Sequence, residues 1–259
     1  MVKLFLQQIE PFLTELAGIT RFTGDFFRTL FKRKFEYREF LKQSYQIGYT
    51  SLLLISITGF ILGMVLTLQS RPVLAEFGAE SWLPSMVAAS IVIEIGPVIT
   101  ALICAGKVGS GIGAEIGSMR VTEQIDAMEV SGTYPMMFVV VTRVLATTLM
   151  VPVLTIYADA IASFGAFIGV NMHSEVALRL FISQSFDAFS FHDFIPAVIK
   201  TFFFGFAIGI IGCYKGYYTS HGTEGVGMAA NTAVIYSSVA VFILDLLAVQ
   251  ITQLLNIIY

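Results

Sequence analysis

The sequence predicts an all-α protein that crosses a membrane several times. Of its 259 residues, 56% are hydrophobic and only 13% are charged, and the mean hydropathy is +0.80. Soluble domains carry about 25% charged residues, so this composition argues against an ordinary soluble fold. The apolar residues also lie in long blocks, and a helix of about 20 such residues spans a bilayer.

Residues 1–44 are expected to form an amphipathic helical region that lies at the membrane interface. Apolar residues recur there at helical spacing between charged ones. No cleavable signal peptide is expected, because Glu10, Pro11 and Glu15 interrupt the first apolar stretch. A basic run follows, which is either a solvated face or a region attracted to anionic lipid: Arg28, Lys32, Arg33, Lys34, Arg38 and Lys42.

Residues 45–259 are expected to form one transmembrane domain with about five spans, near 45–69, 83–106, 137–170, 194–214 and 229–254. The first span has no charged residue and contains Gly48, Gly59 and Gly63, which allow close helix packing. The third is too long for one straight crossing. Tilt, a kink at Pro152 or an extension beyond the bilayer would accommodate it.

Besides Arg143 near the start of the third span, four charged residues interrupt these spans. Because an acid in lipid is costly and usually faces a cavity, Glu94 is the strongest functional candidate, although a neutral acid bonded to a neighbouring helix fits the same position. Lys200 and Asp245 either pair across the fourth and fifth spans or extend toward the interface. Asp159 is expected near the outer surface and receives no role.

Other reactive side chains indicate no chemistry. Cys104 and Cys213 lie in apolar segments, which suggests small buried side chains and no disulfide. The three histidines lack metal-ligand spacing, and no nucleophile lies near a base in a catalytic pattern. We therefore expect neither a metal site nor enzymatic activity on this chain.

The distribution of basic residues predicts the orientation. Eight of them precede the first span, and with five crossings Lys107, Arg120, Arg143 and Lys215 lie on the same side. The positive-inside rule then places the N-terminus and the loops near 107–136 and 215–226 in the cytoplasm. The C-terminus would be periplasmic.

The loop at about 107–136 is expected to contain a short helix. Thr122 can cap its start, Glu123 and Asp126 suit its first turns, Gly132 suits the position after its end, and Pro135 prevents continuation. The helix is either a solvated connection or a docking surface, an apolar and acidic knob made by Met119, Ile125, Met128 and Glu129.

Five glycines precede this helix, at positions 106, 109, 111, 113 and 117. They favour tight helix packing over a phosphate-binding loop, because no strand precedes them and no Gly-Lys-Ser/Thr follows. A nucleotide would therefore have to bind to another chain.

Three separated motifs resemble one known family. They are EIGPVITALICAGKVGSGIGAEIGSMRVTEQIDAMEVSGTYP at 94–135, GMVLTLQ at 63–69 and SSVAVFILD at 237–245. The chain from about residue 45 to the end resembles the MlaE-type permeases, membrane subunits of lipid-transporting ABC systems. One departure is Ile93, where the family usually has an arginine beside the glutamate. Either another residue compensates, or Glu94 is held protonated.

The resemblance implies a homodimeric permease in the bacterial inner membrane, which moves phospholipid and supports lipid homeostasis of the outer membrane. It implies a cytoplasmic ABC ATPase, which would hold ATP and Mg, and a periplasmic MCE-domain ring, with no cofactor on this chain and no nucleic acid partner. The family's coupling helix corresponds to about 115–130. The residues expected to contact the ATPase are Glu115, Met119, Glu123, Asp126 and Glu129.

A lipid cavity is expected beside the first span. Met64, Leu68, Val73 and Leu74 would line acyl chains, and Glu94 would be a polar point near the head group. Arg71 just beyond the span either meets a lipid phosphate, which its planar guanidinium matches, or is an ordinary interfacial arginine.

Two other functional classes compete with this hypothesis. A proton-coupled secondary transporter would use Glu94, Lys200 and Asp245 as a relay and would work without ATP. A membrane scaffold for an ATPase would tolerate substitutions at Glu94 and in the first span, but not in the loop.

Overall fold

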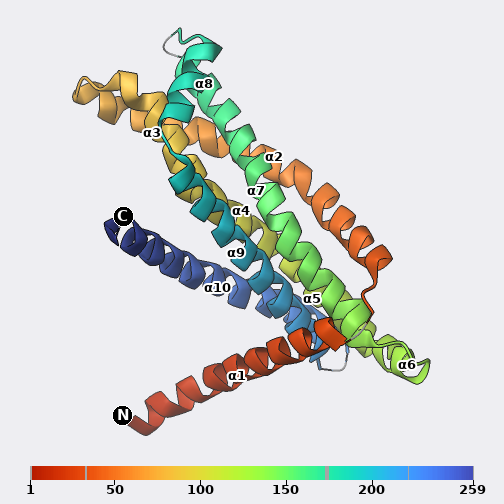
Figure 1. Cartoon of the computed structure of the whole chain (residues 1–259). Coiled ribbons are helices and arrows are strands. Elements are labelled where there is room, and N and C mark those ends of the chain that lie inside the picture. Colours follow the sequence, from red (N-terminus) through yellow and green to blue (C-terminus); the bar gives the residue numbers. More distant parts are fainter. Residues whose placement is uncertain (1, 33, 173–174, 221, 259) are drawn as a thin grey trace.

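The computed structural model describes residues 2–32, 34–172, 175–220 and 222–258. Within this part of the chain every regular element is a helix, as expected (Figure 1). Five helical runs are long and apolar enough to cross a membrane: Tyr37–Glu76, Glu80–Val121, Met136–Asn171, His192–Tyr217 and Thr223–Leu254. The predicted number of spans is thus confirmed by length and composition.

The elements follow one another in a simple order. Helix α1 (Val2–Lys32) precedes the first span, α2 (Tyr37–Glu76). The second span combines α3 (Leu83–Ser90), α4 (Gly96–Cys104) and α5 (Ser110–Val121), and it leads to the short α6 (Gln124–Val130). Helix α7 (Thr142–Asn171) belongs to the third span, α8 (Leu178–Asp187) follows, and α9 (Phe191–Tyr217) and α10 (Thr223–Ile258) complete the chain.

Three segments within the spans are π-helical, with one extra residue in the turn: Ile91–Ile95, Ala105–Gly109 and Met136–Val141. Such wide turns are rare and often occur at functional positions. The first holds Glu94 just before the Gly96-Pro97 step.

Two boundaries differ most from the expected ones. Helix α2 begins at Tyr37 rather than near residue 45, and the second span stays helical to Val121 rather than ending near residue 106. The glycines of the second span explain the latter difference. As expected of a tightly packed helix, Gly109, Gly113 and Gly117 lie against α9, α10 and the loop between them.

Glycines bring the long helices into close contact. A Cβ at Gly63 of α2 would overlap the backbone carbonyl of Ala162 on α7, and one at Gly165 of α7 would overlap that of Phe60 on α2. A Cβ at Gly205 on α9 would lie 2.6 Å from the carbonyl oxygen of Thr147 on α7. This small-residue packing is typical of membrane helices.

Helix α7 forms the centre of the bundle. In the apolar 18-residue stretch of each candidate span, 67% of the residues are buried for the span of α7, against 28% for α2 and 17% for α10. It passes through Pro152 as one continuous helix. The run from Met136 to Asn171 has 36 residues and would be about 54 Å long at 1.5 Å per residue, which exceeds a bilayer core of about 30 Å.

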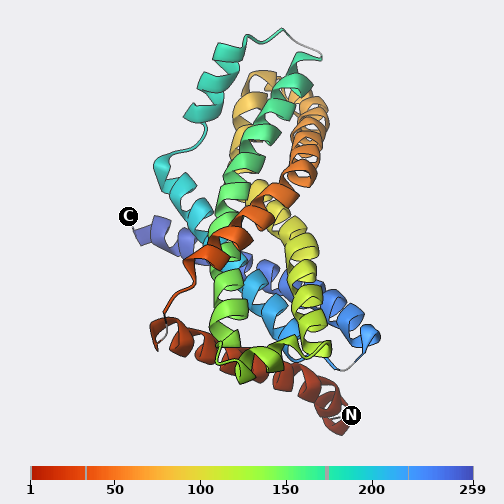
Figure 2. The same ribbon diagram turned by 90° about the vertical axis from the view of Figure 1, so that its right-hand side faces the viewer.

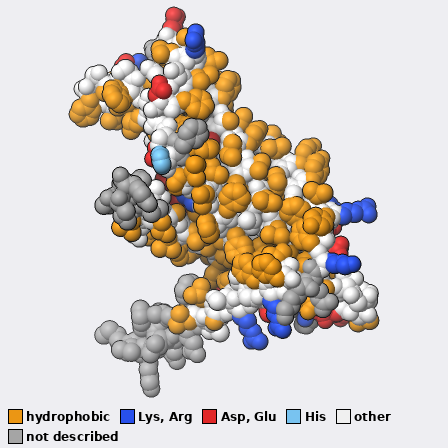
Figure 3. Space-filling view, in the orientation of Figure 1, with side chains coloured by type: hydrophobic (Ala, Val, Ile, Leu, Met, Phe, Trp, Pro, Cys, Tyr) orange, Lys and Arg blue, Asp and Glu red, His pale blue; other side chains and the backbone are white. Residues whose placement is uncertain are grey.

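The bundle has two ends, which we name after the short helices that mark them. At the α6 end lie α1, α6 and the connection between α9 and α10, and at the α8 end lie α3 and α8 (Figures 1 and 2). Apolar side chains cover the middle of the bundle, and most Lys and Arg side chains visible in Figure 3 lie toward the α6 end.

Helix α1 is not among the candidate spans and lies across the α6 end. Its Glu15 pairs with Lys215 of α9, and its buried Phe22 packs against the rings of Tyr214, Tyr217 and Tyr218. Several large apolar residues on other faces of α1 remain exposed, including Leu13, Leu16 and Phe31. This division agrees with an interfacial helix.

Candidate functional site

A charged cluster joins three spans inside the apolar part of the bundle. Lys200 on α9 donates to Glu94 at 2.5 Å and to Asp245 on α10 at 3.0 Å. The Lys200 side chain is only 6% exposed, against 41% for Glu94 and 14% for Asp245. The pairing of Lys200 with Asp245, one of two sequence-based alternatives, is therefore confirmed.

The same lysine supplies the cation that Ile93 does not provide. Glu94 and Lys200 are 106 residues apart in the sequence, so no local pattern could reveal their contact. Of the two explanations for the missing arginine, compensation by another residue is the one that the geometry supports.

Asp159 on α7 has a more specific environment than the sequence could indicate. It is 8% exposed, and its Oδ1 atom has no hydrogen-bond partner among the described residues. The carboxylate packs against Gly96, where a Cβ would overlap Oδ1. Asp159 thus contacts the Gly-Pro step that directly follows the segment of Glu94.

The predicted lipid-contacting residues lie along α2 without forming one cavity wall. Val73 is 56% exposed, whereas Met64 and Leu68 are half-buried. Leu74 packs against the apolar cluster around Leu83 and Ile91. Their role in lipid binding stays a prediction.

Arg71 lies near an acid, with 3.9 Å between its Nη2 atom and Oε1 of Glu80. It is partly exposed, with 26% of its side chain accessible. Among the described residues no contact joins Arg71 to Glu94. Both interpretations of Arg71 therefore stay open.

A shallow groove of about 370 Å³ lies on a neighbouring face of α2 and ends at Ile95, next to Glu94. The lipid-contacting residues predicted from the sequence lie on an adjacent face of α2. The face that borders the groove was not predicted, because an apolar helix carries no signal that distinguishes it. Its lining residues are Thr58, Ile61, Leu62, Val65, Leu66, Gln69 and Ile95.

The short helix at the α6 end differs from the expected one at its start. Thr122 does not cap it, because its hydroxyl donates back to the carbonyl oxygen of Ser118. Glu123 occupies the N-cap position instead, with a left-handed φ of 57° and no side-chain cap bond. The predicted cap is therefore wrong, since α5 extends to Val121 and keeps Thr122 bonded to its last turn.

The end of this helix agrees with expectation. Gly132 follows the C-cap with φ of 78°. The amide of Gly132 donates to Glu129 O and that of Thr133 to Met128 O, the paired pattern that commonly ends helices at glycine.

Helix α6 presents its acids and Val130 to solvent, whereas its Ile125 and Met128 face the core. Ile125 is fully buried, and Met119 and Met128 pack against the main core. The expected apolar knob is thus turned inward. Glu123 and Glu129 remain exposed, while Asp126 pairs with Arg120 at 2.6 Å.

Glu115 lies deeper, on α5. Its Oε1 atom accepts from Arg143 at 2.8 Å, and Arg143 also donates to Val139 O at 2.9 Å. The Arg143 side chain is 4% exposed and that of Glu115 is 43% exposed. Glu115 therefore links α5 to α7, and contact with another protein stays a prediction.

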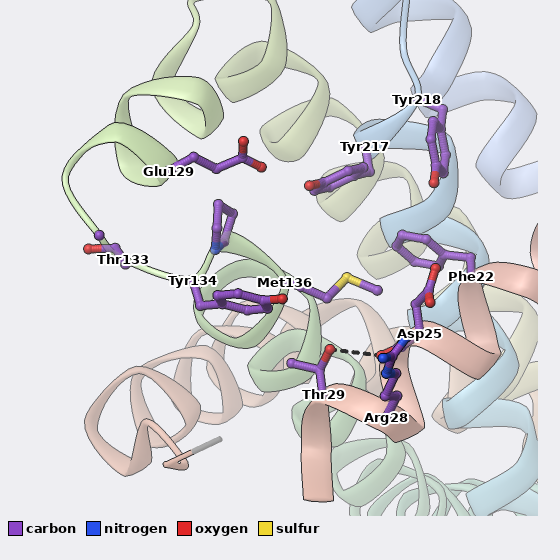
Figure 4. Close-up of a pocket in the computed structure, with 12 residues that line it drawn as sticks. Phe22, Asp25, Arg28, Thr29, Glu129, Thr133, Tyr134, Met136, Tyr217 and Tyr218 are labelled. Carbon is purple, nitrogen blue, oxygen red and sulfur yellow. Dashed lines mark hydrogen bonds between the residues drawn. The ribbon is translucent and has the colours of Figure 1, made fainter. Parts of the chain in front are cut away.

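A polar cavity of about 750 Å³ lies between α1, the end of α6 and the end of α9 (Figure 4). Glu129 borders it on one side and Asp25 and Arg28 of α1 on the other, with Tyr217 and Tyr218 between them. The surface around α6 therefore includes α1, which sequence reasoning treated as a separate interfacial element.

A helical bundle with five potential spans and a lysine that joins two acids between them defines a multi-pass membrane protein with a polar centre. The model of the family described as Permease MlaE matches residues 40–251. The chain belongs to this family.

Three relatives illustrate the similarity. A probable ABC transporter permease protein of Rickettsia typhi is 37% identical over 215 residues, which cover 83% of this chain and 82% of the relative. A probable ABC transporter permease protein of Synechocystis is 34% identical over 221 residues, or 85% and 84% of the two chains. The intermembrane phospholipid transport system permease protein MlaE of Haemophilus influenzae is 37% identical over 213 residues, or 82% and 81%.

Proposed function

We propose that this chain is the permease subunit of an ATP-driven ABC transporter that moves phospholipid between the inner membrane and periplasmic MCE-type carriers. Its similarity to the phospholipid permease of Haemophilus influenzae over 82% of the chain carries the proposal. The polar centre among the spans supports it, because buried charges in membrane proteins commonly mark substrate pathways.

ATP and Mg would bind to a separate cytoplasmic ATPase that docks at the α6 end. The exposed acids Glu123 and Glu129 support this proposal, since complementary charge fixes the register of a docking surface. Because Ile125 of the same helix is buried in the main core, a displacement of α6 would be transmitted to the spans. The pair between Glu115 and Arg143 extends this connection to α7.

We further propose that two copies form a homodimer through α2 and α10, with the MCE-domain protein at the α8 end. The two helices are the least buried of the five candidate spans. A partner copy would cover apolar surface that the single chain leaves exposed, and the α2 groove beside Ile95 would then lie near the dimer interface.

The proposal is tested by purification from native membranes. Wild-type chain should bring down an ATPase subunit and phospholipid, and the variant Glu123→Lys/Asp126→Lys should lose the ATPase. The matched control, Glu175→Lys/Asp187→Lys, makes the same charge change on two exposed acids, one before α8 and one at its last residue, and should retain the ATPase. Loss of the ATPase in both variants, or in neither, would contradict the docking assignment.

The charged cluster also fits the proton-coupled alternative, since a lysine between two acids is a plausible relay. Reconstituted vesicles separate the two functions. Lipid transfer that needs ATP and the ATPase supports the ABC assignment, whereas transfer driven by a proton gradient alone favours the alternative. The absence of any ATPase from wild-type preparations would point the same way.

A further inference from the structure

A second cavity, distinct from the α2 groove, lies toward the α8 end. It has a volume of about 740 Å³, within the range of about 300–1,000 Å³ that is typical of small-molecule sites. Elements α3, α7, α8 and the start of α9 surround it, and these meet at that end of the bundle in Figure 1. Most of its wall is apolar and rich in phenylalanine: Phe181, Phe186, Phe189 and Phe194.

Two polar side chains in this wall lack partners. Asp159 and Ser185 both line the cavity and are each 8% exposed. Neither Oδ1 of Asp159 nor Oγ of Ser185 has a hydrogen-bond partner among the described residues. An unsatisfied buried polar group costs roughly 1–3 kcal/mol, and more when it is charged. A ligand that donates hydrogen bonds would satisfy both oxygens, because an ionised carboxylate only accepts and a hydroxyl both accepts and donates.

The charges nearby favour a cation. Lys200 is a cation of this region, but its ammonium already contacts Glu94 and Asp245. Because Glu94 and Asp245 occupy this lysine, the carboxylate of Asp159 has no paired cation among the described residues. A carboxylate is costly to ionise in a low-dielectric surrounding, and a positive group bound beside it would compensate that cost.

The apolar wall constrains the rest of the ligand. The rings of Phe186, Phe189 and Phe194 follow one another with centroids 6.0 Å and 6.4 Å apart, so they form a continuous aromatic surface. A small hydrated cation would gain nothing from this surface. An amphiphile would place its acyl chain there.

We propose that this cavity binds a phospholipid whose head group ends in a primary ammonium. The ammonium donates to Asp159 and Ser185, and an acyl chain lies along the phenylalanines. A trimethylated head group is disfavoured because it has no N–H to donate to either oxygen. An anionic head group is disfavoured because no free cation lines the cavity among its described residues.

This inference rests on the proposed function in one respect, because it assumes that the protein lies in a phospholipid bilayer. It adds a head-group preference and a second lipid position away from α2. It does not require ATP-driven transport, so binding experiments test it separately from the docking experiment.

The test measures which lipid stays bound. Purified protein is reconstituted in nanodiscs with equal amounts of phosphatidylethanolamine, phosphatidylcholine and phosphatidylglycerol, then released and analysed by native mass spectrometry. Wild type should retain phosphatidylethanolamine in preference to the other two. Asp159→Asn, which keeps the shape but removes the charge, should lower that preference about tenfold, as the loss of one charge-assisted hydrogen bond implies.

A matched control replaces an exposed acid at the same end, Asp187→Asn, which should leave the preference unchanged. Ser185→Ala changes only the second polar partner and should give a smaller decrease, so the site remains testable if Asp159→Asn does not fold. Equal retention of the three lipids by wild type, or an unchanged preference in both cavity variants, would overturn the proposal.

A chemical readout requires no variant. A carbodiimide condenses a carboxylate with a primary amine in contact with it, forming an amide while the reagent takes up the oxygen as a urea. Wild type in phosphatidylethanolamine should give a lipid adduct on the peptide that contains Asp159, and none in phosphatidylcholine. Adducts on exposed acids alone would contradict the proposed position of the ammonium.

Discussion

Lys200 compensates the charges of two acids inside the bundle. Its ammonium contacts Glu94 and Asp245 from different spans, so each carboxylate has a cationic partner within 3.0 Å. Burying such charges is costly, and removing one partner leaves the others uncompensated. The lysine therefore acts on three helices at once.

Replacing Lys200 by methionine should destabilise the protein more than removing all three charges together. Lys200→Met leaves two acids facing each other, and we expect it to lose roughly 2–3 kcal/mol. The triple variant Glu94→Gln/Lys200→Met/Asp245→Asn should recover most of that loss. Thermal unfolding in detergent measures both, and equal destabilisation would show that charge pairing is not the cause.

Two arginines near the α6 end should differ strongly in importance. Arg143 is buried against Glu115, whereas Arg120 pairs with the exposed Asp126. We expect Arg143→Ala to lower the unfolding free energy by about 2–3 kcal/mol and Arg120→Ala by less than about 1 kcal/mol. Chemical or thermal unfolding of the two variants compares them directly, and a larger effect at Arg120 would be the contrary result.

Single residues were only partly predictable from the sequence. Glu94 was identifiable because an acid within an apolar run is conspicuous. Its contact with Lys200, and the burial of Asp159 against Gly96, depend on helices that are distant in the sequence. Thr122 shows that a local pattern can also give a wrong prediction. A residue suited to capping keeps its bond to the preceding helix when that helix extends.

The helices themselves depend on small residues at their crossings. Glycines of α2, α7 and α9 face backbone carbonyls of a neighbouring helix, so the helices approach more closely than larger side chains would allow. The first-span glycines were predicted to pack in this way. Gly48, Gly59 and Gly63 all contact α7, and the prediction is confirmed.

Adding one methyl group should distinguish glycines that pack against another helix from glycines that have open space around them. Gly63→Ala places a Cβ into the carbonyl of Ala162 and should cost about 1–3 kcal/mol by overpacking. Gly111→Ala on α5 meets no atom within 4 Å and should leave stability unchanged or slightly increased. Thermal unfolding distinguishes them, and similar losses in both would argue against the close approach of α2 and α7.

At the scale of the whole molecule, hydropathy was sufficient to predict the number of spans. The limits of the second span were not predictable in the same way, because a glycine-rich sequence suits both a loop and a tightly packed helix. The arrangement around α7 also required the structure, since all five spans are similarly apolar and nothing in their composition marks the central one.

The orientation of the chain can be tested with two introduced cysteines. Native Cys104 and Cys213 are fully buried and should not react with an impermeant maleimide. In spheroplasts Glu175→Cys between α7 and α8 should be labelled from outside, and Ser131→Cys after α6 only after lysis. The reverse pattern would invert the orientation that the basic residues predict.

The homodimer can be tested by cross-linking along α10. Exposed positions on this helix should form disulfides between copies, because a two-fold axis brings equivalent residues together. Cysteines at Ile235, Val239, Phe242 and Leu246 form the test set, and Ile195, Ile199 and Phe203 on α9 form the control set. Cross-links confined to α9 would move the interface away from α10.

The π-helical turns should allow the chain to lose one residue without changing how its helices pack. Each accommodates one residue more than a regular turn, so deleting a single residue within 105–109 would convert the wide turn to an ordinary one and keep the helix faces on either side in register. The same deletion in the regular part of α7 would rotate every following side chain by about 100°. Relatives that differ by one residue at these turns could therefore share the same bundle.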